Sequence, residues 1–304
     1  MTIWTPEFRG TASFYAVLQN LPLLGLISLG FAVTMISGEL DLAITSIAAV
    51  GGVVTAQVAG AGLVPALVLG TLSGTALGLV QGWLIGRLRI SSLSFTIGSL
   101  ILIRGLAYVA AGDTTVQITN LNVTNIFLNR YWIFSFASIV ALCVYAVVGI
   151  FLSVVRYGRE LYAVGGGRAE ARALGIPPGR PLLIAFAISG TCAALAGALT
   201  TMQGGAADPA AFSDTLIFGV AGAIIGGVSL YGGRGTVINV LLGVLLLGVL
   251  SAGLTAHGEM EATTNIVTGV VLLVVVGFAA LGHVLARLGI VERFRIGKAQ
   301  SAGG

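Results

Sequence analysis

The residues that could carry out catalysis in this chain are scarce, and their spacing matches no catalytic or metal-binding motif. His257 and His283 stand near the ends of apolar stretches, without a second histidine, cysteine or carboxylate at metal-binding spacing. Cys143 and Cys192 lie in separate apolar stretches, where cysteine packs as a small apolar residue. GxSxG and HExxH do not occur, and the stretch GGRGTV (232–237) lacks the lysine that holds phosphate in nucleotide-binding loops. The sequence therefore predicts no enzyme, no metal and no cofactor, and ATP hydrolysis would require another chain.

Four carboxylates, in the segments 39–45 and 208–214, are the remaining groups that could bind a ligand. Ionisable residues inside a membrane span would indicate an ion-coupled carrier, but these four fall in turns or at the ends of apolar stretches. Only Arg104 lies well inside one, where a charge costs about 2.5–3.5 kcal/mol on insertion scales. We expect Arg104 to reach the interface or to pair, with Asp113 as one candidate partner. The pattern shows no proton relay.

The elements that position these groups must fold in lipid. A soluble chain carries about 25% charged residues, whereas this chain of 304 residues carries 9% and has a mean hydropathy of +1.03. The composition therefore predicts an integral membrane protein.

Nine apolar stretches are long enough to cross a membrane, since a helix needs roughly 20 mostly apolar residues to do so. The longest interruptions, 113–130 and 156–180, are too short to form a soluble domain. The sequence thus predicts an all-α, polytopic membrane protein, with residues 1–304 in a single transmembrane domain. The predicted spans are 14–37, 40–62, 63–88, 91–112, 131–155, 181–205, 211–233, 235–258 and 262–286.

Lysine and arginine concentrate in the loop 156–180 and in the tail 287–304. Short cytoplasmic loops are enriched in these residues, so both segments are predicted to lie in the cytoplasm. The four spans between them are an even number, so the two assignments agree. They place 113–130 and 257–261 outside and, with nine spans, the N-terminus outside as well. Membrane orientation explains the pI of 9.4, and we expect no nucleic-acid partner.

Two parts of the chain, 36–112 and 207–283, resemble each other at an offset of 171 residues, with several glycines in equivalent positions. Five spans separate equivalent helices, an odd number, so the halves would be inverted, as in many transporters. Chance alignment of glycine-rich helices is the alternative. Within 70–86 a glycine recurs at every fourth residue, which places the glycines on one helix face and predicts tight helix packing.

The loop 156–180 also has a pattern of its own. Glycines 165–167 form a predicted hinge, and the stretch RAEARAL that follows contains good helix formers. Gly175 and the prolines 177–178 would end this helix. A short exposed helix of this kind is suited to docking in a partner's groove. A basic loop that only orients the protein is the alternative.

Five stretches resemble the sugar-type permeases of bacterial ATP-binding-cassette (ABC) importers, the ribose, xylose and galactose group. YAVGGGRAEARALGI (162–176) resembles their cytoplasmic coupling segment, and SGELDLAITS (37–46) resembles their SGGIDLSVGS signature. RISSLSFTIGSLILIRGLA (89–107) and SGTCAALAGAL (189–199) are also similar to the family. AIIGGVSLYGGRGTVINVLLG (223–243) is the most specific match. The resemblance covers nearly the whole chain from about residue 8.

This resemblance implies a multi-pass inner-membrane subunit that forms a solute path and has no catalytic residue. Its partners would be a cytoplasmic ABC ATPase, a second permease in a homo- or heterodimer, an extracytoplasmic solute-binding protein, a small-molecule substrate and membrane lipid. The residues expected to couple to the ATPase are Gly165, Gly166, Arg168, Glu170, Arg172, Leu174 and Gly175. The candidate residues of the translocation path are Glu39, Asp41, Thr45, Asp208, Asp214 and Asn265.

The family has ten helices, and its coupling helix follows the sixth, whereas here the coupling segment follows the fifth predicted span. WTPEFRGTASF resembles the stretch after the family's first span. We therefore expect either a start upstream of Met1 or a member that lacks one helix.

Departures from the family pattern leave the solute open. Two acidic positions of the family are Leu216 and Phe218 here, so the path has lost groups that hydrogen-bond a carbohydrate. A monosaccharide or related solute is the first expectation. Branched-chain amino acids or nucleosides are alternatives, as is a secondary carrier or channel that works without an ATPase.

Overall fold

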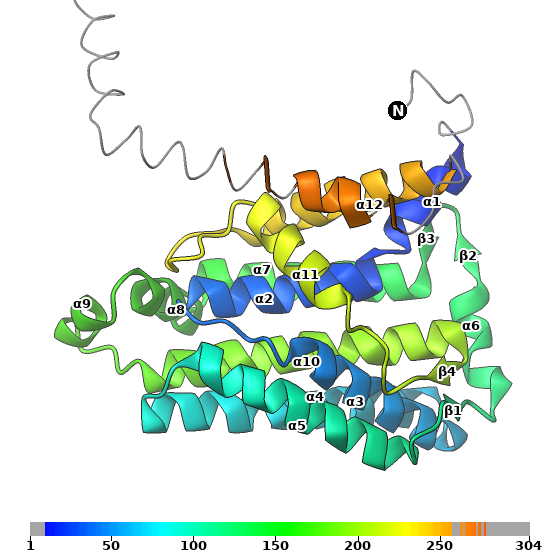
Figure 1. The fold of residues 1–304 in the computed structure, drawn as a ribbon, viewed down its shortest axis with the longest axis horizontal. Helices are drawn as coiled ribbons and strands as arrows, with labels where there is room; N and C mark the ends of the chain where they lie inside the picture. The colour runs from blue at the N-terminus through cyan, green and yellow to red at the C-terminus, as the bar shows by residue number, and fades with distance from the viewer. Residues whose placement is uncertain (1–9, 257–261, 264, 272, 275–276, 278–304) are drawn as a thin grey trace, which may run out of the picture.

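The computed structural model describes residues 10–256, 262–263, 265–271, 273–274 and 277 (Figure 1). The predictions for His257, His283, the loop 257–261 and the tail 287–304 concern residues outside these ranges. The same holds for much of the predicted span 262–286.

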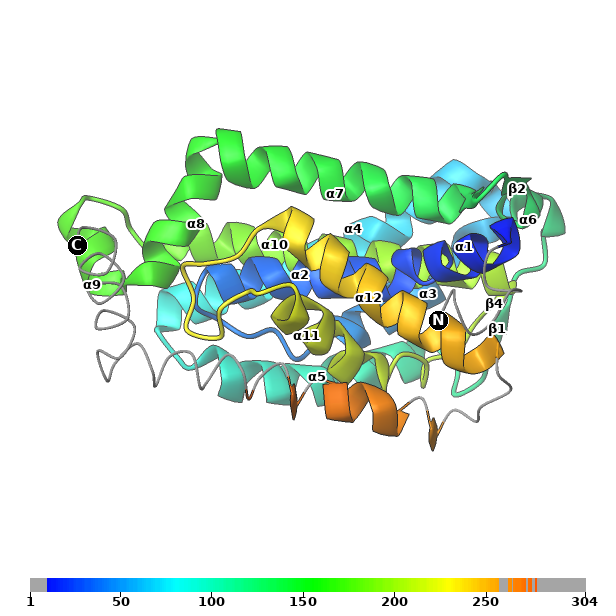
Figure 2. The ribbon, with the colours of Figure 1, turned by 90° about the horizontal axis from the view of Figure 1, so that it is seen from above.

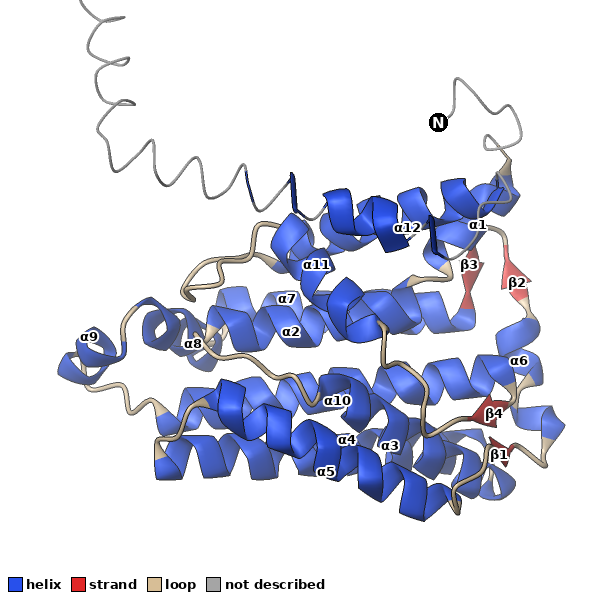
Figure 3. Ribbon diagram, in the orientation of Figure 1, coloured by secondary structure: helices blue, strands red, loops and turns tan. Residues whose placement is uncertain are grey.

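Seven helices in the described part of the chain are long and apolar enough to cross a membrane, and the strands are two residues each (Figure 3). The predicted all-α membrane fold is thus confirmed. The first span, Thr11–Ile36, joins α1 (Thr11–Leu18), the π-helical turn η2 (Leu21–Gly25) and α2 (Leu26–Ile36). The others are α3 with the short helix η3 (Ile44–Val58 and Ala59–Ala61), α4 (Leu63–Leu88), α5 (Ser92–Ala111), α7 (Phe136–Val154), α10 (Gly179–Gly204) and α12 (Val237–Ala256).

One predicted span, 211–233, is wrong in length. The structure has α11 (Thr215–Ile225), whose eleven residues extend about 16 Å, roughly half of the hydrocarbon core. Gly227, with φ of +77°, ends this helix, and the residues after it form turns that include Gly232 and Gly233, also at positive φ. Backbone of this kind favours glycine and cannot continue a right-handed helix.

Two helices begin part-way along the length of the bundle (Figure 1). After α2 ends, the segment 37–43 runs back between the helices before α3 begins at Ile44 (Figure 1). The segment 208–214 likewise precedes α11, which begins at Thr215, 171 positions after Ile44. Figure 1 shows α3 and α11 running in opposite directions from these starts.

The two ends of the bundle differ (Figure 2). One end, called the α9 end below, carries α8 (Arg156–Gly166) and α9 (Arg168–Ala173). The opposite end, the β end, carries the short helices η4 (Leu121–Val123) and α6 (Asn125–Leu128) with two antiparallel strand pairs. In these pairs β1 (Val116–Gln117) meets β4 (Ala206–Ala207), and β2 (Arg130–Tyr131) meets β3 (Phe134–Ser135).

Glycine permits the close packing of α4 on α10 and α3. A methyl group added at Gly78 would overlap the carbonyl oxygen of Phe186, and one at Gly74 would overlap Ala194. On α10, a methyl group at Gly190 would overlap the backbone of Gly74. The predicted role of the glycines within 70–86 in tight helix packing is confirmed.

We expect Gly78→Ala to lower the free energy of unfolding by about 1–3 kcal/mol, because the added methyl group has no space. Gly98→Ala on α5 is the matched control, since nothing lies within 4 Å of its added methyl group. Alanine also favours a helix over glycine by up to about 1 kcal/mol. Thermal unfolding of the two purified variants in detergent would measure the difference, and equal melting temperatures would contradict this account.

Candidate functional site

The α9 end presents a short helix with defined limits. Gly167 adopts an extended backbone at the start of α9, and a side chain there would collide with the carboxylate of Glu170. At the other end, Gly175 has a φ of +79°, and the N–H of Ile176 donates to the carbonyl of Ala171 at 2.9 Å. This is a left-handed glycine cap, and it ends α9 where the sequence predicted.

The outer face of α9 carries charged and apolar side chains together. Ala171 is buried and turns one face of the helix inward, whereas Glu170 and Arg172 are exposed. Leu174, at the C-cap, is 78% exposed. Leu174 is thus accessible to a partner chain.

The predicted glycine hinge is only partly correct. Gly165 and Gly166 belong to the last turn of α8, and only Gly167 lies between the two helices. A methyl group at Gly165 would overlap the carbonyl oxygen of Ile36 and lie 2.7 Å from the backbone nitrogen of Gly233. Close packing, and not flexibility, requires glycine here.

Three segments therefore meet at the α9 end: the end of α2, the end of α8 and the loop 229–235. The N–H of Gly233 donates to the carbonyl of Ile36 at 2.9 Å. A methyl group added at Gly232 would overlap the backbone of Gly38 and Gly165. We call Gly38, Gly165, Gly232 and Gly233 the glycine junction.

An ion pair joins α9 to the segment 37–43. The guanidinium of Arg168 contacts the carboxylate of Glu39, whose side chain is 6% exposed, against 42% for Arg168. Burial lowers the pKa of Arg168 from its ordinary value, and the nearby charge of Arg172 lowers this pKa further. The sequence assigned Glu39 to the path and Arg168 to the coupling segment, and the structure brings the two together. Sequence analysis missed this contact, and the only available signal was their opposite charge beside glycines.

Asp41 is fully buried and holds the start of α3. One carboxylate oxygen accepts from the Ser189 hydroxyl on α10 at 2.7 Å, and the other accepts from the N–H of Ala43 at 3.2 Å. The backbone of Leu40 forms two hydrogen bonds to side chains of α5. Its N–H donates to the Ser92 hydroxyl at 3.3 Å, and its carbonyl accepts from the Thr96 hydroxyl at 3.2 Å. The segment 37–43 is thus fixed to two helices.

We expect Asp41→Leu to lower the free energy of unfolding by about 2–4 kcal/mol, because it leaves two buried donors, on Ser189 and Ala43, without acceptors. Asp41→Asn keeps an acceptor and should cost less. Asp208→Leu is the control, because Asp208 accepts from the N–H of Ala210 at 2.8 Å but is exposed. Thermal unfolding in detergent would rank the three variants. Asp41→Leu as stable as Asp41→Asn would contradict the hydrogen bonds assigned to Asp41.

The other predicted path residues do not form one cluster. Thr45 is buried in α3 and, among the residues that the structure describes, its hydroxyl has no hydrogen-bond partner. Asp208 and Asp214 are exposed in the turn before α11. Arg104 donates to the Ser213 hydroxyl in this turn at 2.5 Å, so the partner suggested by the sequence, Asp113, is not the one found.

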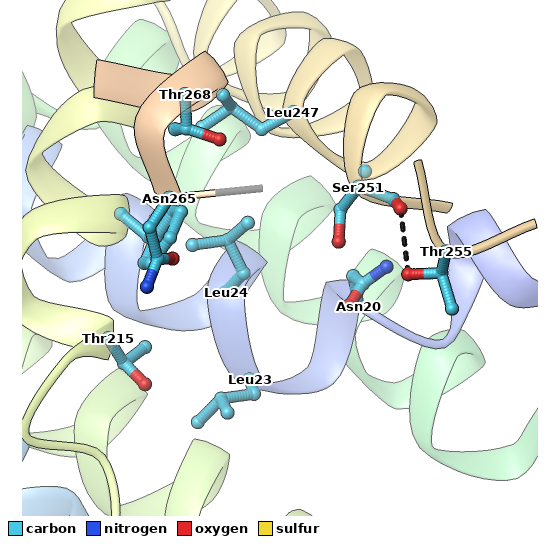
Figure 4. Close-up of a pocket in the computed structure, with 11 residues that line it drawn as sticks. Asn20, Leu23, Leu24, Thr215, Leu247, Ser251, Thr255, Asn265 and Thr268 are labelled. Atoms are coloured by element: carbon cyan, nitrogen blue, oxygen red, sulfur yellow. Dashed lines mark hydrogen bonds between the residues drawn. The ribbon is translucent and has the colours of Figure 1, made fainter. Parts of the chain in front are cut away.

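A cavity of about 410 Å³ lies between η2, the start of α11, α12 and the described part of 262–271 (Figure 4). Figure 4 shows Asn20, Ser251 and Thr255 grouped at one side and Asn265 across from them. Of the predicted path residues, only Asn265 lines this cavity. Its polar side chains are Asn20, Thr215, Ser251, Thr255, Asn265 and Thr268, and none of the described residues that line it is charged.

Sequence analysis missed the other five polar residues of the cavity. Ser251 and Thr255 are four residues apart on α12, and Asn265 and Thr268 are three apart, so each pair lies on one helix face. Paired polar residues on one face of an apolar helix were the signal that could have found Ser251, Thr255 and Thr268; Asn20 and Thr215 belong to no such pair.

Comparison with known proteins identifies the family. The family model described as "Branched-chain amino acid transport system / permease component" matches residues 13–276. The chain belongs to this permease family. It is 32% identical to the D-allose transport system permease protein of Escherichia coli (strain K12), over 74% of this chain and 70% of that protein.

Other sugar permeases are nearly as similar to this permease. The L-arabinose ABC transporter permease protein of Azospirillum brasilense is 29% identical over 82% of this chain and 74% of its own length. The ribose import permease protein of Bacillus subtilis (strain 168) is 28% identical over 83% and 79%. No solved structure matches the chain significantly. The expected resemblance to sugar-type ABC permeases is confirmed, and the chain is a multi-pass inner-membrane transport subunit rather than an enzyme.

Proposed function

We propose that this permease forms the path by which an ABC importer takes up a monosaccharide. The relatives named for D-allose, L-arabinose and ribose transport support this solute class. The single observation that carries the proposal is the cavity, whose polar lining consists of neutral amide and hydroxyl groups. Such groups replace the water around sugar hydroxyls. A cation or a carboxylate would find no counter-charge among the described residues of this cavity.

The α9 end faces the cytoplasm in this proposal, in keeping with the five arginines of 156–180. A separate ATPase docks on α9 through Arg172 and Leu174, while a solute-binding protein delivers the sugar to the β end. Lipid or a second permease, identical or related, covers α4 and α5. In the most apolar 18-residue stretch of each helix, only 22% and 17% of the residues are buried within this chain.

In the mechanism of this permease, movement of the ATPase is transmitted through contacts between segments of the chain. ATP-driven movement of the ATPase displaces α9, and the Arg168–Glu39 ion pair transmits that displacement to the segment 37–43. The glycine junction keeps α2, α8 and the loop 229–235 in backbone contact, so these segments move together. Because Asp41 and Leu40 fix the segment 37–43 to α10 and α5, the movement reaches the start of α3. Packed helices of this kind switch between discrete arrangements.

The two halves act as an inverted repeat in this proposal. α3 and α11 begin 171 residues apart, each after a non-helical segment, and run in opposite directions. Inverted repeats with interrupted helices commonly surround the solute site of a transporter. The turns 39–45 and 208–214 would then be equivalent elements on opposite sides of the path.

Uptake tests this function. The permease is expressed with its own ATPase and binding protein in cells that lack other sugar importers, and labelled D-allose, L-arabinose, D-ribose and leucine are compared. We expect ATP-dependent uptake of at least one sugar and none of leucine. Uptake of leucine alone would favour the amino-acid alternative and contradict the proposal.

A further inference from the structure

The described residues of this cavity combine uncharged polar side chains with an apolar wall. Its apolar residues are Leu23, Leu24, Phe218 and Leu247. A cavity of about 410 Å³ lies near the lower limit of the range of about 300–1,000 Å³ for small-molecule pockets. A single sugar ring, with C–H groups on its faces and hydroxyls around its edge, matches this division into apolar wall and polar groups.

Part of the polar lining is available to a ligand. Among the residues that the structure describes, the side chains of Ser251 and Asn265 have no hydrogen-bond partner. The amide of Asn20 donates to the carbonyl of Ala16 at 3.3 Å, and the Thr255 hydroxyl donates to the carbonyl of Ser251 at 3.0 Å. The oxygens of Asn20 and Thr255 therefore remain as acceptors for ligand hydroxyls.

Five of the six polar residues that line the cavity belong to the second of the two similar parts of the chain, and the sixth is Asn20. The positions 171 residues before Thr215, Ser251, Thr255 and Thr268 are all apolar, and only the one before Asn265 is a serine, Ser94. Helix packing alone therefore does not require polar residues at these places. The four apolar equivalents are Ile44, Val80, Leu84 and Ile97.

We propose that this cavity, between η2, α11 and α12, is the site where the permease itself binds one uncharged monosaccharide, with Asn20, Ser251, Thr255 and Asn265 contacting its hydroxyls. The proposal rests on the proposed function. It adds a sugar site in the permease, distinct from that of the binding protein, and assigns three of its four contacts to the second half of the chain.

Cysteine protection tests the location. Ser251→Cys is made in a Cys143→Ser background, because Cys143 is exposed and Cys192 is buried, and the full transporter is labelled with a small polar thiol reagent. The labelling rate is measured with and without the sugar that the parent imports. We expect the sugar to slow labelling at residue 251 severalfold. Asn239→Cys, on the same helix but outside the cavity, should label equally with and without sugar.

Uptake by Asn265→Leu is the second measurement. At saturating binding protein, we expect its maximal uptake rate to fall about tenfold, the effect of one or two lost hydrogen bonds. Asn239→Leu should transport at nearly the parent rate. If the parent imports no sugar, the proposed function fails. If the parent imports sugar while residue 251 is not protected and Asn265→Leu transports normally, the proposed function stands and this site is overturned.

Discussion

Reversing the charge of either Glu39 or Arg168 is expected to lower ATP-driven uptake by about tenfold or more. Glu39→Arg places two cations together at a site where the residue-39 side chain is 6% exposed. An exposed ion pair contributes up to about 1 kcal/mol, and breaking a buried one costs about 3–5 kcal/mol. This pair has one buried partner and lies between these limits, and about 1.4 kcal/mol corresponds to a tenfold change. Arg168→Glu has the same effect with two anions. Uptake of the transported sugar into membrane vesicles would measure both variants.

Restoring the ion pair with its charges exchanged distinguishes loss of this contact from a general loss of folding. The double variant Glu39→Arg/Arg168→Glu should recover a large part of the uptake lost by either single change. Arg159→Glu is the control, since Arg159 is exposed and its guanidinium donates to the carbonyl of Val154 at 3.0 Å rather than to a carboxylate. A double variant no better than the single variants would contradict transmission through the ion pair.

The second large effect is expected on the outer face of α9. Leu174→Asp combined with Arg172→Glu should reduce ATP-driven uptake to the background rate. Leu174 is 78% exposed at the end of α9, and the few side chains that dominate an interface each contribute about 2 kcal/mol or more. Reversing the charge of Arg172 adds repulsion. Vesicle uptake, with the amount of inserted permease held equal, gives the result.

Leu174→Met keeps an apolar side chain of similar volume and should transport at close to the parent rate. Thermal unfolding of the doubly substituted permease should match the parent, because both side chains are exposed. Parent-level uptake by the Leu174→Asp/Arg172→Glu variant would show that α9 does not contact the ATPase.

Membrane-crossing helices were predictable wherever hydropathy alone decides their length. The predicted span 63–88 is identical to α4, and 91–112 differs from α5 by one residue at each end. The predicted span 211–233 is too long because the apolar composition continues past Ile225, while the backbone turns at Gly227. Hydropathy does not distinguish a helical glycine from one at positive φ.

Contacts between distant segments were not predictable. Glu39 and Arg168 are far apart in sequence, and nothing local to either residue specifies the other. Gly165 is compatible with both a hinge and close packing, and only the position of Ile36 decides between them. The cavity likewise combines residues from four separate segments, so the sequence contained its short polar patterns but not their assembly.

Copurification from native membranes tests the central claim most directly. The parent permease and the Leu174→Asp/Arg172→Glu variant are extracted in mild detergent, and every accompanying chain is identified. We expect an ABC ATPase with the parent and its loss from the variant, while a second permease remains with both. Absence of an ATPase from the parent, under conditions that preserve a known complex of this kind, would contradict the account. Equal recovery of the ATPase with both proteins would also contradict it.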